Sequence, residues 1–339
     1  MAEKVYDKTY SEYLKEKFPA KEGFIKRIEE LIGVKDAKKF FEIAYTKTPN
    51  SIRCNTLKIT PEELKKRFES YGWKITQPFN ELPEIMIIKG TKPGEIGNSR
   101  EHLLGYFYVQ EISSMLPILT LQPKPEEFIL DLCASPGSKT TQAAALMQNT
   151  GTIIANEVSL GRIGILNSNI ERCGITNTIV TRKEGSALCN IFSKKTNMKF
   201  DKILVDAPCS GEGTLRKSPK TFQMWNPNMI KKIAKTQKRL ASAALQILKV
   251  DGTLVYSTCT LAPEENEMII DFLIKNFDIE ILEIKLPLKF RCGICSWEGQ
   301  EFSSELKKCL RLYPQDNDTD GFFVTKIKKL SDKCLLNKK

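Results

Sequence analysis

Two cysteines stand directly after predicted strands in the second half of the chain. Cys209 ends the run Asp206-Ala207-Pro208-Cys209, and Cys259 ends the run Ser257-Thr258-Cys259. A cysteine thiolate can add to an electron-poor carbon, so each residue is a candidate for covalent catalysis. A single cysteine at such a place is more often a small packed residue. Two of them after neighbouring strand ends favour a catalytic site.

A loop of small residues follows an earlier predicted strand, at 128–132. Small residues let the backbone approach a ligand closely, as glycine does in dinucleotide sites. Glu157 ends the next predicted strand, roughly 20 residues past Gly137, where such folds place an acid on a ribose hydroxyl. The loop residues that we consider cofactor contacts are Cys133, Ala134, Ser135, Pro136, Gly137, Ser138 and Lys139.

The composition of this loop favours one class of cofactor. It contains neither Gly-x-Gly-x-x-Gly nor Gly-x-x-x-x-Gly-Lys-Ser/Thr, so a phosphate cradle is not expected. S-adenosylmethionine has a ribose and an adenine but no phosphate, and it fits this pattern better. The alternative is an ordinary turn between a strand and a helix.

A regular alternation of strands and helices begins at Phe128 and must position these residues. Continuous apolar strands that alternate with helices predict a parallel sheet covered on both faces, with all strand ends at one rim. Leu310–Tyr313 and Phe322–Ile327 flank a polar turn and predict an antiparallel hairpin at the far edge. The expected strands are 128–132, 152–156, 178–181, 202–205 and 253–256, and the expected helices are 140–148, 159–173 and 229–249.

The first part of the chain has a different pattern. Ser51–Ile59 alternates like a strand, and Thr60, Pro61 and Glu63 then form a helix start with a capping box. We expect a helical extension at 1–46, a small α/β domain at 47–122, a catalytic domain at 123–330 and a frayed tail at 331–339.

Charge and composition restrict the partner and the compartment. Lys and Arg number 52 against 41 Asp and Glu, a formal net charge of +11, which favours nucleic acid first and an anionic membrane surface second. A solvated lysine surface would give the same count. The polar start of the chain is unlike a signal peptide, and the apolar runs are strand-sized, so we expect a cytoplasmic protein without a membrane segment.

Metal and histidine chemistry are both disfavoured. The chain has one Cys-x-x-Cys pair, Cys292 and Cys295, and one histidine, His102. A zinc site needs about four ligands, and no second pair completes one, so we expect no metal. A lone histidine also argues against a Cys–His or Ser–His nucleophile pair, although a different base stays open.

Five motifs in order resemble the Nol/Nop/Sun family of RNA cytosine-5 methyltransferases. The resemblance implies a Rossmann-like class I methyltransferase domain with a mostly parallel sheet and a C-terminal antiparallel hairpin, preceded by a small α/β RNA-recognition-like domain. It also implies S-adenosyl-L-methionine as cofactor and RNA as partner. The motifs are QEISSMLP (110–117), DLCASPGSKTTQ (131–142), DAPCSGEGTLRK (206–217), YSTCTLAPEENE (256–267) and RLYPQDNDTDGFF (311–323).

The resemblance also implies roles for individual residues. Cys259 would add to C6 of the cytosine, and Cys209 would act when the adduct breaks down. Asp206 would bond the base edge beside the cofactor, and Lys139 would stabilise charge. We expect Arg162, Glu184 and Asp206 to contact the cofactor, although Glu184 stands where the family has an aspartate against the adenine. The expected RNA contacts are Arg53, Arg216, Lys217, Lys235 and Arg239.

Other functions stay open at this point. PGSKTTQ and GEGTLRK resemble the tRNA-modifying branch, with ribosomal RNA as the second candidate substrate. A small-molecule or protein methyltransferase on the same fold would leave the cysteine pair and the N-terminal domain unexplained. An idle RNA-binding protein would be free to lose Cys209 and Cys259. The need for an accessory protein is also open.

Overall fold

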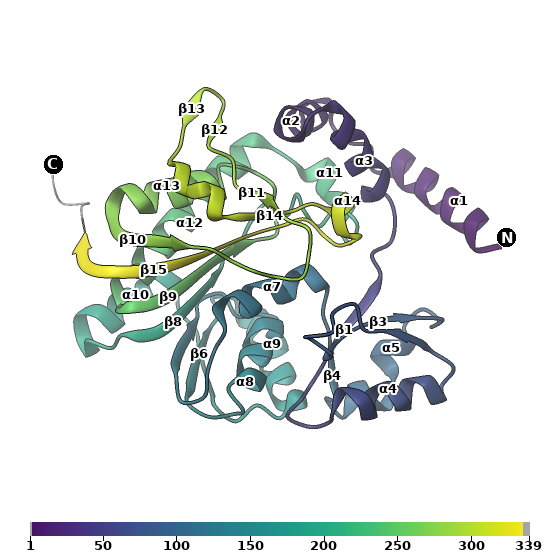
Figure 1. Ribbon diagram of the computed structural model, residues 1–339, viewed down its shortest axis with the longest axis horizontal. Helices are drawn as coiled ribbons and strands as arrows, with labels where there is room; N and C mark the ends of the chain where they lie inside the picture. The colour runs from purple at the N-terminus through teal and green to yellow at the C-terminus, as the bar shows by residue number, and fades with distance from the viewer. Residues whose placement is uncertain (1, 335–339) are drawn as a thin grey trace.

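The computed structural model describes residues 2–334 of the 339-residue chain, and the side chains of residues 10–333. Figure 1 shows a large α/β domain, a small α/β domain beside it, and a group of helices at the N-terminus. Among the described residues, no helix has the length and apolar composition needed to cross a bilayer.

The large domain is built on a mixed sheet that is parallel at its centre. In the described chain this sheet has nine strands, in the order β11-β14-β15-β9-β8-β5-β6-β7, with β10 paired to β15. The strand order reverses beside β5, and in such sheets ligands bind where the order reverses. The parallel strands are β5 (Phe128–Asp131), β6 (Thr152–Asn156), β7 (Thr178–Thr181), β8 (Phe200–Asp206) and β9 (Leu248–Thr258).

The antiparallel edge confirms the expected hairpin and extends it. β14 (Leu310–Leu312) pairs with β15 (Phe322–Cys334), which also pairs with β9 and with β10 (Phe277–Leu282). The prediction of a frayed tail from Ser331 is wrong as far as Cys334, because Ser331 Oγ donates to Asp278 and Asp332 pairs with Lys199 and Lys329. Residues 335–339 of that tail lie outside the described part.

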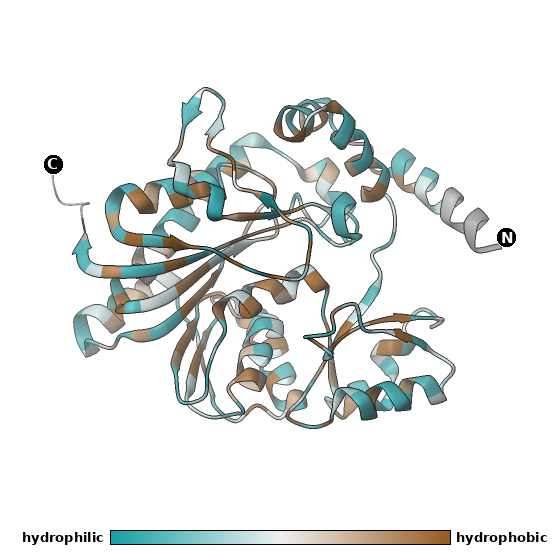
Figure 2. Cartoon of the chain, in the orientation of Figure 1, coloured by the Kyte–Doolittle hydropathy of each residue, from teal (hydrophilic) through white to brown (hydrophobic). Residues whose placement is uncertain are grey.

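Helices cover both faces of the sheet. On one face lie α7 (Ile112–Leu121), α8 (Ser138–Leu146) and α9 (Leu160–Cys173), and on the other α10 (Gly185–Ile191), α12 (Pro227–Ile247) and α13 (Glu267–Asn276). Figure 2 shows the apolar residues gathered between these layers. The remaining short elements are η1 (Phe192–Thr196), α11 (Lys220–Met224), β11 (Arg291–Cys292), β12 (Ser296–Trp297), β13 (Gln300–Glu301), η2 (Ser304–Lys308) and α14 (Pro314–Asn317).

The small domain is a four-stranded antiparallel sheet with one main helix. Its strand order is β2 (Lys74–Thr76), β3 (Ile85–Lys89), β1 (Asn50–Cys54), β4 (Phe107–Val109), and α4 (Pro61–Ser70) starts with the expected capping box of Thr60 and Glu63. Two short helices, α5 (Glu95–Asn98) and α6 (Arg100–Leu103), precede β4. The first strand ends at Cys54, not at Ile59, and the side-chain amide of the next residue, Asn55, donates to the carbonyls of Gly105 and Cys173.

Helix α7 packs with the large domain, although we expected the small domain to extend to residue 122. Its apolar residues Ile118 and Leu121 pack with Ile129, Ala143 and other residues of the large domain. The helix contacts α8, β8, β9 and β15. The small sheet therefore ends before α7, and we propose a boundary near residue 111.

The N-terminal helices pack on the large domain. They are α1 (Ala2–Lys17), α2 (Glu22–Ile32) and α3 (Val34–Ala44). The rings of Phe24 and Trp225 lie 5.5 Å apart, and Tyr45 stacks on Phe222 at 4.8 Å. Trp225 is thus a packed residue, and its indole N–H donates to Glu212 at 2.7 Å.

Candidate active site

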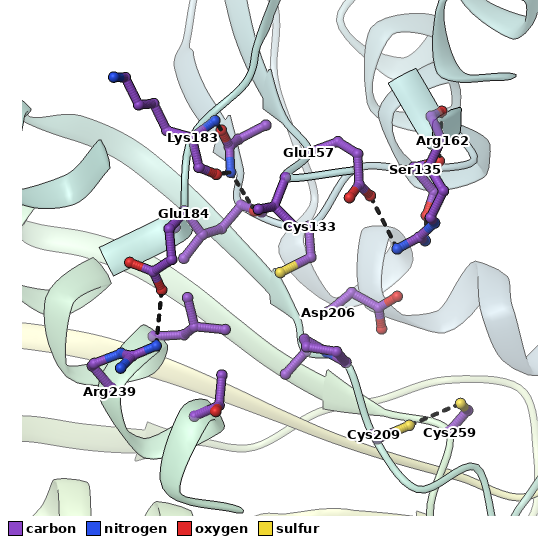
Figure 3. Close-up of a pocket in the computed structure, with 18 residues that line it drawn as sticks. Cys133, Ser135, Glu157, Arg162, Lys183, Glu184, Asp206, Cys209, Arg239 and Cys259 are labelled. Atoms are coloured by element: carbon purple, nitrogen blue, oxygen red, sulfur yellow. Dashed lines mark hydrogen bonds and ion pairs between the residues drawn. The ribbon is translucent and has the colours of Figure 1, made fainter. Parts of the chain in front are cut away.

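A cavity of about 370 Å³ opens at the carboxyl ends of β5, β6 and β8. Its size is typical of small-molecule sites. In Figure 3, Cys209 and Cys259 lie together at one side of the cavity. The pairs Glu157–Arg162 and Glu184–Arg239 lie at other sides of it. The cavity is lined by Leu132, Cys133, Ser135, Asn156, Glu157, Val158, Arg162, Lys183, Glu184, Gly185, Asp206, Ala207, Pro208, Cys209, Thr236, Arg239, Leu240 and Cys259.

The loop after β5 contributes three residues to this lining, Leu132, Cys133 and Ser135. The other loop residues shape it. Ala134 N–H donates to the carbonyl of Asn156 at 2.8 Å, and Gly137 begins α8 at φ +103°. A side chain at Gly137 would be strained at that φ and would meet Leu166 at 3.0 Å. The carbonyls of Pro136 and Ser138 accept hydrogen bonds from Tyr108 and Arg53.

Glu157 lies at the end of β6 and is held by two donors. The backbone N–H of Ser159 donates to Oε1 at 2.8 Å, and Arg162 Nη1 lies 3.0 Å from Oε2. Arg162 also donates to the carbonyl of Ser135 at 2.6 Å. The Glu157 side chain is buried, and each of its oxygens still has a lone pair for a ligand hydroxyl.

Glu184 lines the opposite end of the cavity, and the protein already uses its carboxylate. Oε2 accepts from Ala187 N–H and caps α10, while Oε1 accepts from Arg239 at 3.1 Å. Burial, the largest single effect, acts to raise the pKa of Glu184, but hydrogen bonds from Ser186 and Ala187 and the charge of Arg239 outweigh it, so the pKa is lowered. Contact between Glu184 and an adenine stays a prediction. At the neighbouring Gly185, a Cβ would come within 2.6 Å of a Leu240 methyl group, so a larger residue there would force Leu240 to shift.

Asp206 connects the cavity to Lys139. Lys139 Nζ lies 2.7 Å from Asp206 Oδ2, and Ser257 Oγ donates to Oδ1 at 2.7 Å. Lys139 also donates to Ser114 Oγ at 3.2 Å. Burial disfavours the charged form of Lys139, but Asp206 outweighs it, so the pKa of Lys139 is raised. Lys139 therefore keeps its positive charge beside Asp206, which lines the same cavity as the two thiols.

The two cysteines meet at the side of the cavity. Cys209 Sγ and Cys259 Sγ lie 3.0 Å apart, and both thiols are free. The hydrogen bond with Cys259 and burial raise the pKa of Cys209 well above its usual value. Cys209 therefore keeps its proton at neutral pH.

Several residues beside the site were missed from the sequence. Ser114 and Ser257 lie within the motifs 110–117 and 256–267, but serine residues in a motif give no sign that they will bond Lys139 and Asp206. Gln237 carried a detectable signal, because it interrupts the apolar stripe of α12 formed by Ile230, Ile233 and Leu240. Glu265 gave no such signal, since a glutamate in a motif of three acids has no pattern that marks it as buried.

Two of the expected RNA contacts are corrected by the structure. Arg53 is 4% exposed and donates to Gln110, Ser138 O and Thr141, which joins the small domain to α8. Arg216 is 6% exposed, and its guanidinium donates to the carbonyls of Lys47 and Thr319. Because their donors are used inside the protein, these arginines hold segments together and do not face solvent. Lys217, Lys235 and Arg239 are exposed.

Family comparison covers most of the chain. The profile of the family described as 16S rRNA methyltransferase RsmB/F matches residues 118–328. The profile described as the N-terminal domain of 16S rRNA methyltransferase RsmF matches residues 20–112. The second match starts within the N-terminal helices and takes in the whole small sheet.

Individual known proteins are similar over nearly the same span. A tRNA (cytosine(49)-C(5))-methyltransferase of Pyrococcus abyssi is 41% identical over 310 residues, which cover 90% of this chain and 96% of that protein. A ribosomal RNA small subunit methyltransferase F of Vibrio cholerae is 42% identical over 284 residues, which cover 83% of this chain and 58% of that protein. This chain thus spans little more than half of the Vibrio protein.

Among solved structures, a methyltransferase homolog protein from Pyrococcus horikoshii superposes with a TM-score of 0.81. It is 36% identical, and the match covers 94% of this chain and 98% of that one. The likeness therefore includes the N-terminal helices and the small domain as well as the large domain.

Proposed function

Because the chain belongs to the 16S rRNA methyltransferase RsmB/F family, we propose that it methylates C5 of a cytosine in tRNA with S-adenosylmethionine. It is an RNA methyltransferase that depends on S-adenosylmethionine. The observation that carries the proposal is the pair of thiols 3.0 Å apart at the edge of a cavity of cofactor size. Cytosine C5 is a poor nucleophile, and covalent activation at C6 requires a thiol at this place.

The cavity fits this cofactor. Both of its arginines are paired with carboxylates, Arg162 with Glu157 and Arg239 with Glu184, which suits a ligand without phosphates. Glu157 would hold the ribose hydroxyls, and Leu132, Val158 and Leu240 would enclose the adenine. When bound there, S-adenosylmethionine supplies an electrophilic methyl group on a sulfonium. Cys133, Ser135 and Asp206 complete the lining that would face it.

Changing Glu157 to Ala should weaken cofactor binding in the absence of RNA by roughly tenfold or more, because it removes a charged hydrogen-bond acceptor. Isothermal titration calorimetry with S-adenosylmethionine measures this directly. Glu171→Ala, which removes an exposed carboxylate at the other end of α9, is the matched control and should bind normally. Equal affinities for the two variants would remove Glu157 from the site.

The chain's own residues can perform the reaction on a cytosine that has left its stack. The Cys259 thiolate adds to C6, and the π electron pair of the C5–C6 double bond moves to C5, which then takes the methyl group while the C5–C6 single bond remains. Asp206 would hold the N3 and N4 edge of the base, and Lys139 beside it would balance charge. The C5 proton is then lost to solvent water, and its bonding electron pair re-forms the C5–C6 double bond as the bond between C6 and Cys259 breaks.

Cys209 would serve this last step. Its thiol lies 3.0 Å from Cys259 Sγ and keeps its proton because its pKa is raised. It can therefore donate that proton to the departing Cys259 sulfur. This gives Cys209 a role in release rather than in addition.

RNA would lie over the exposed cations near this cavity. Lys235 and Arg239 are exposed residues of α12, and Lys217 is an exposed residue of the segment between β8 and α11 that also contains Cys209. Lys217 Nζ is held 3.0 Å from the buried carboxylate of Asp320, which orients it. We include the small domain in the RNA-binding surface, and a tRNA substrate would place the protein in the cytoplasm.

The choice of tRNA over ribosomal RNA is tested by bisulfite mapping in cells that lack the protein. The Pyrococcus relative, which acts on tRNA, is matched along 96% of its length, whereas 58% of the Vibrio ribosomal RNA enzyme is matched. We therefore expect a 5-methylcytosine to disappear from tRNA and to return with the wild-type gene. Loss from ribosomal RNA with unchanged tRNA would reverse the assignment.

A further inference from the structure

The backbone on both sides of Cys209 is held by two buried side chains. Gln237 Nε2 donates to the carbonyl of Pro208 at 2.9 Å and to Glu265 Oε2 at 2.8 Å. The same Glu265 oxygen accepts from the N–H of Ser210 at 3.0 Å. The chain of hydrogen bonds therefore runs from the residue before Cys209 to the residue after it.

The residues on both sides of Cys259 are held by Asn266, which follows Glu265 in the sequence. Thr258 Oγ1 donates to Asn266 Oδ1 at 2.6 Å, and Asn266 Nδ2 donates to the carbonyl of Thr260 at 3.0 Å. Glu265 thus holds the loop that contains Cys209, and the next residue, Asn266, holds the loop that contains Cys259. We call these segments the two cysteine loops. The peptide bond between Glu265 and Asn266 fixes the distance between the two side chains that hold them.

Further contacts make the arrangement rigid. Ser210 Oγ and Thr260 Oγ1 lie 2.7 Å apart and join the two loops directly. Tyr256 donates to the carbonyl of Glu265 at 2.6 Å. The side chains of Gln237, Glu265 and Asn266 are fully buried, where hydrogen bonds cost most to lose.

The Glu265 carboxyl is not explained by packing alone. Its second oxygen, Oε1, is buried without a hydrogen-bond partner among the described residues, as is Oε1 of Gln237. Burial raises the pKa of Glu265 to about 7. A buried acid with an unused oxygen costs stability, so its retention beside the Cys209 loop indicates a role in the site.

We propose that Glu265 and Asn266 are positioning residues with separate duties: Glu265, with Gln237, aligns Cys209 for adduct release, and Asn266 aligns Cys259 for addition to C6. The division follows from the hydrogen bonds, because each residue contacts only one of the two cysteine loops through its side chain. The inference rests on the proposed function, since it assigns each residue to one step of that reaction.

The test compares Glu265→Gln and Asn266→Ala in single-turnover reactions with substrate RNA and labelled methyl donor. In Glu265→Gln, the amide oxygen can still accept from Gln237 and Ser210, but the carboxylate charge is removed, so these hydrogen bonds lose their charge-assisted strength. We expect methyl transfer to stay near the wild-type rate while the covalent adduct decays roughly tenfold more slowly and accumulates on denaturing gels. Asn266→Ala should instead slow adduct formation roughly tenfold or more, without accumulation.

The control is Glu264→Gln, the same chemical change one residue earlier. Glu264 pairs with Arg27 of α2 and contacts neither cysteine loop through the hydrogen bonds described above, so both steps should stay unchanged. Gln237→Ala removes the donor to Pro208 and should slow decay as Glu265→Gln does. If the Glu265 variant does not fold, as judged by circular dichroism and cofactor binding, Gln237→Ala replaces it in the test.

Two results would overturn the proposal. One is that Glu265→Gln and Asn266→Ala slow adduct formation alike, which is what a shared structural role would do. The other is that the adduct decays normally in both Glu265→Gln and Gln237→Ala. Failure of the proposed function gives a different result, because the wild-type protein would then form no adduct and Cys259→Ala would still methylate.

Discussion

Replacing Cys259 with Ala should abolish both methylation and the covalent RNA adduct. The reason is that Cys259 forms the bond to C6 that activates C5 in the proposed mechanism, whereas the neighbouring Cys209 keeps its proton. The loss of a nucleophile from a catalytic unit typically costs a thousandfold or more in rate, and we expect a loss on the order of a thousandfold here. Incorporation of labelled methyl into RNA and a denaturing gel measure the two effects on the same sample.

The control for this change is Cys292→Ala, which removes an exposed thiol in β11 and should methylate normally. RNA with 5-fluorocytosine at the target should trap the wild-type protein, because fluorine cannot leave as a proton does, and should not trap Cys259→Ala. If Cys259→Ala kept full activity, covalent catalysis would be wrong for this protein. A small-molecule or protein methyltransferase would then be the better hypothesis.

Replacing Cys209 with Ala should have the opposite effect on the adduct. Addition and methyl transfer need Cys259, so they should continue, but the proton donor 3.0 Å from its sulfur is gone. The methylated RNA should then stay bound, and a slowly migrating band should appear with unmodified substrate RNA. Turnover should fall on the order of a hundredfold or more, in the range of general acid catalysis, while a single round of methyl transfer is retained.

The reverse pattern would also be informative. If Cys209→Ala lost the adduct and Cys259→Ala kept it, the nucleophile would be the cysteine of the Pro-Cys pair, and the roles of the two thiols would be exchanged. Cofactor binding to both variants, measured without RNA, separates these outcomes from misfolding. Both thiols lie at the edge of the cavity, so neither change should reduce that binding more than severalfold.

The sequence by itself determined the parallel sheet, the rim at its strand ends and the small domain before it. These features follow from local patterns in the sequence. Apolar strands alternate with helices, and the capping box of Thr60 and Glu63 joins residues only three apart, so it does not depend on distant parts of the chain. Cys209, Cys259, Glu157 and the loop after β5 all stand just past strand ends. In a parallel sheet, positions past the strand ends come together at one edge, so their nearness could be predicted without coordinates.

Tertiary structure decided which charged and polar side chains are buried and what they hold. Arg53 and Arg216 resemble RNA contacts in sequence, yet backbone carbonyls from distant segments take up their donors. The bonds that position the thiols join Ser210 to Glu265 and Pro208 to Gln237, across 55 and 29 residues. Charge and spacing along a chain do not specify such partners, because the burial that makes these hydrogen bonds strong exists only after the helices and loops have packed.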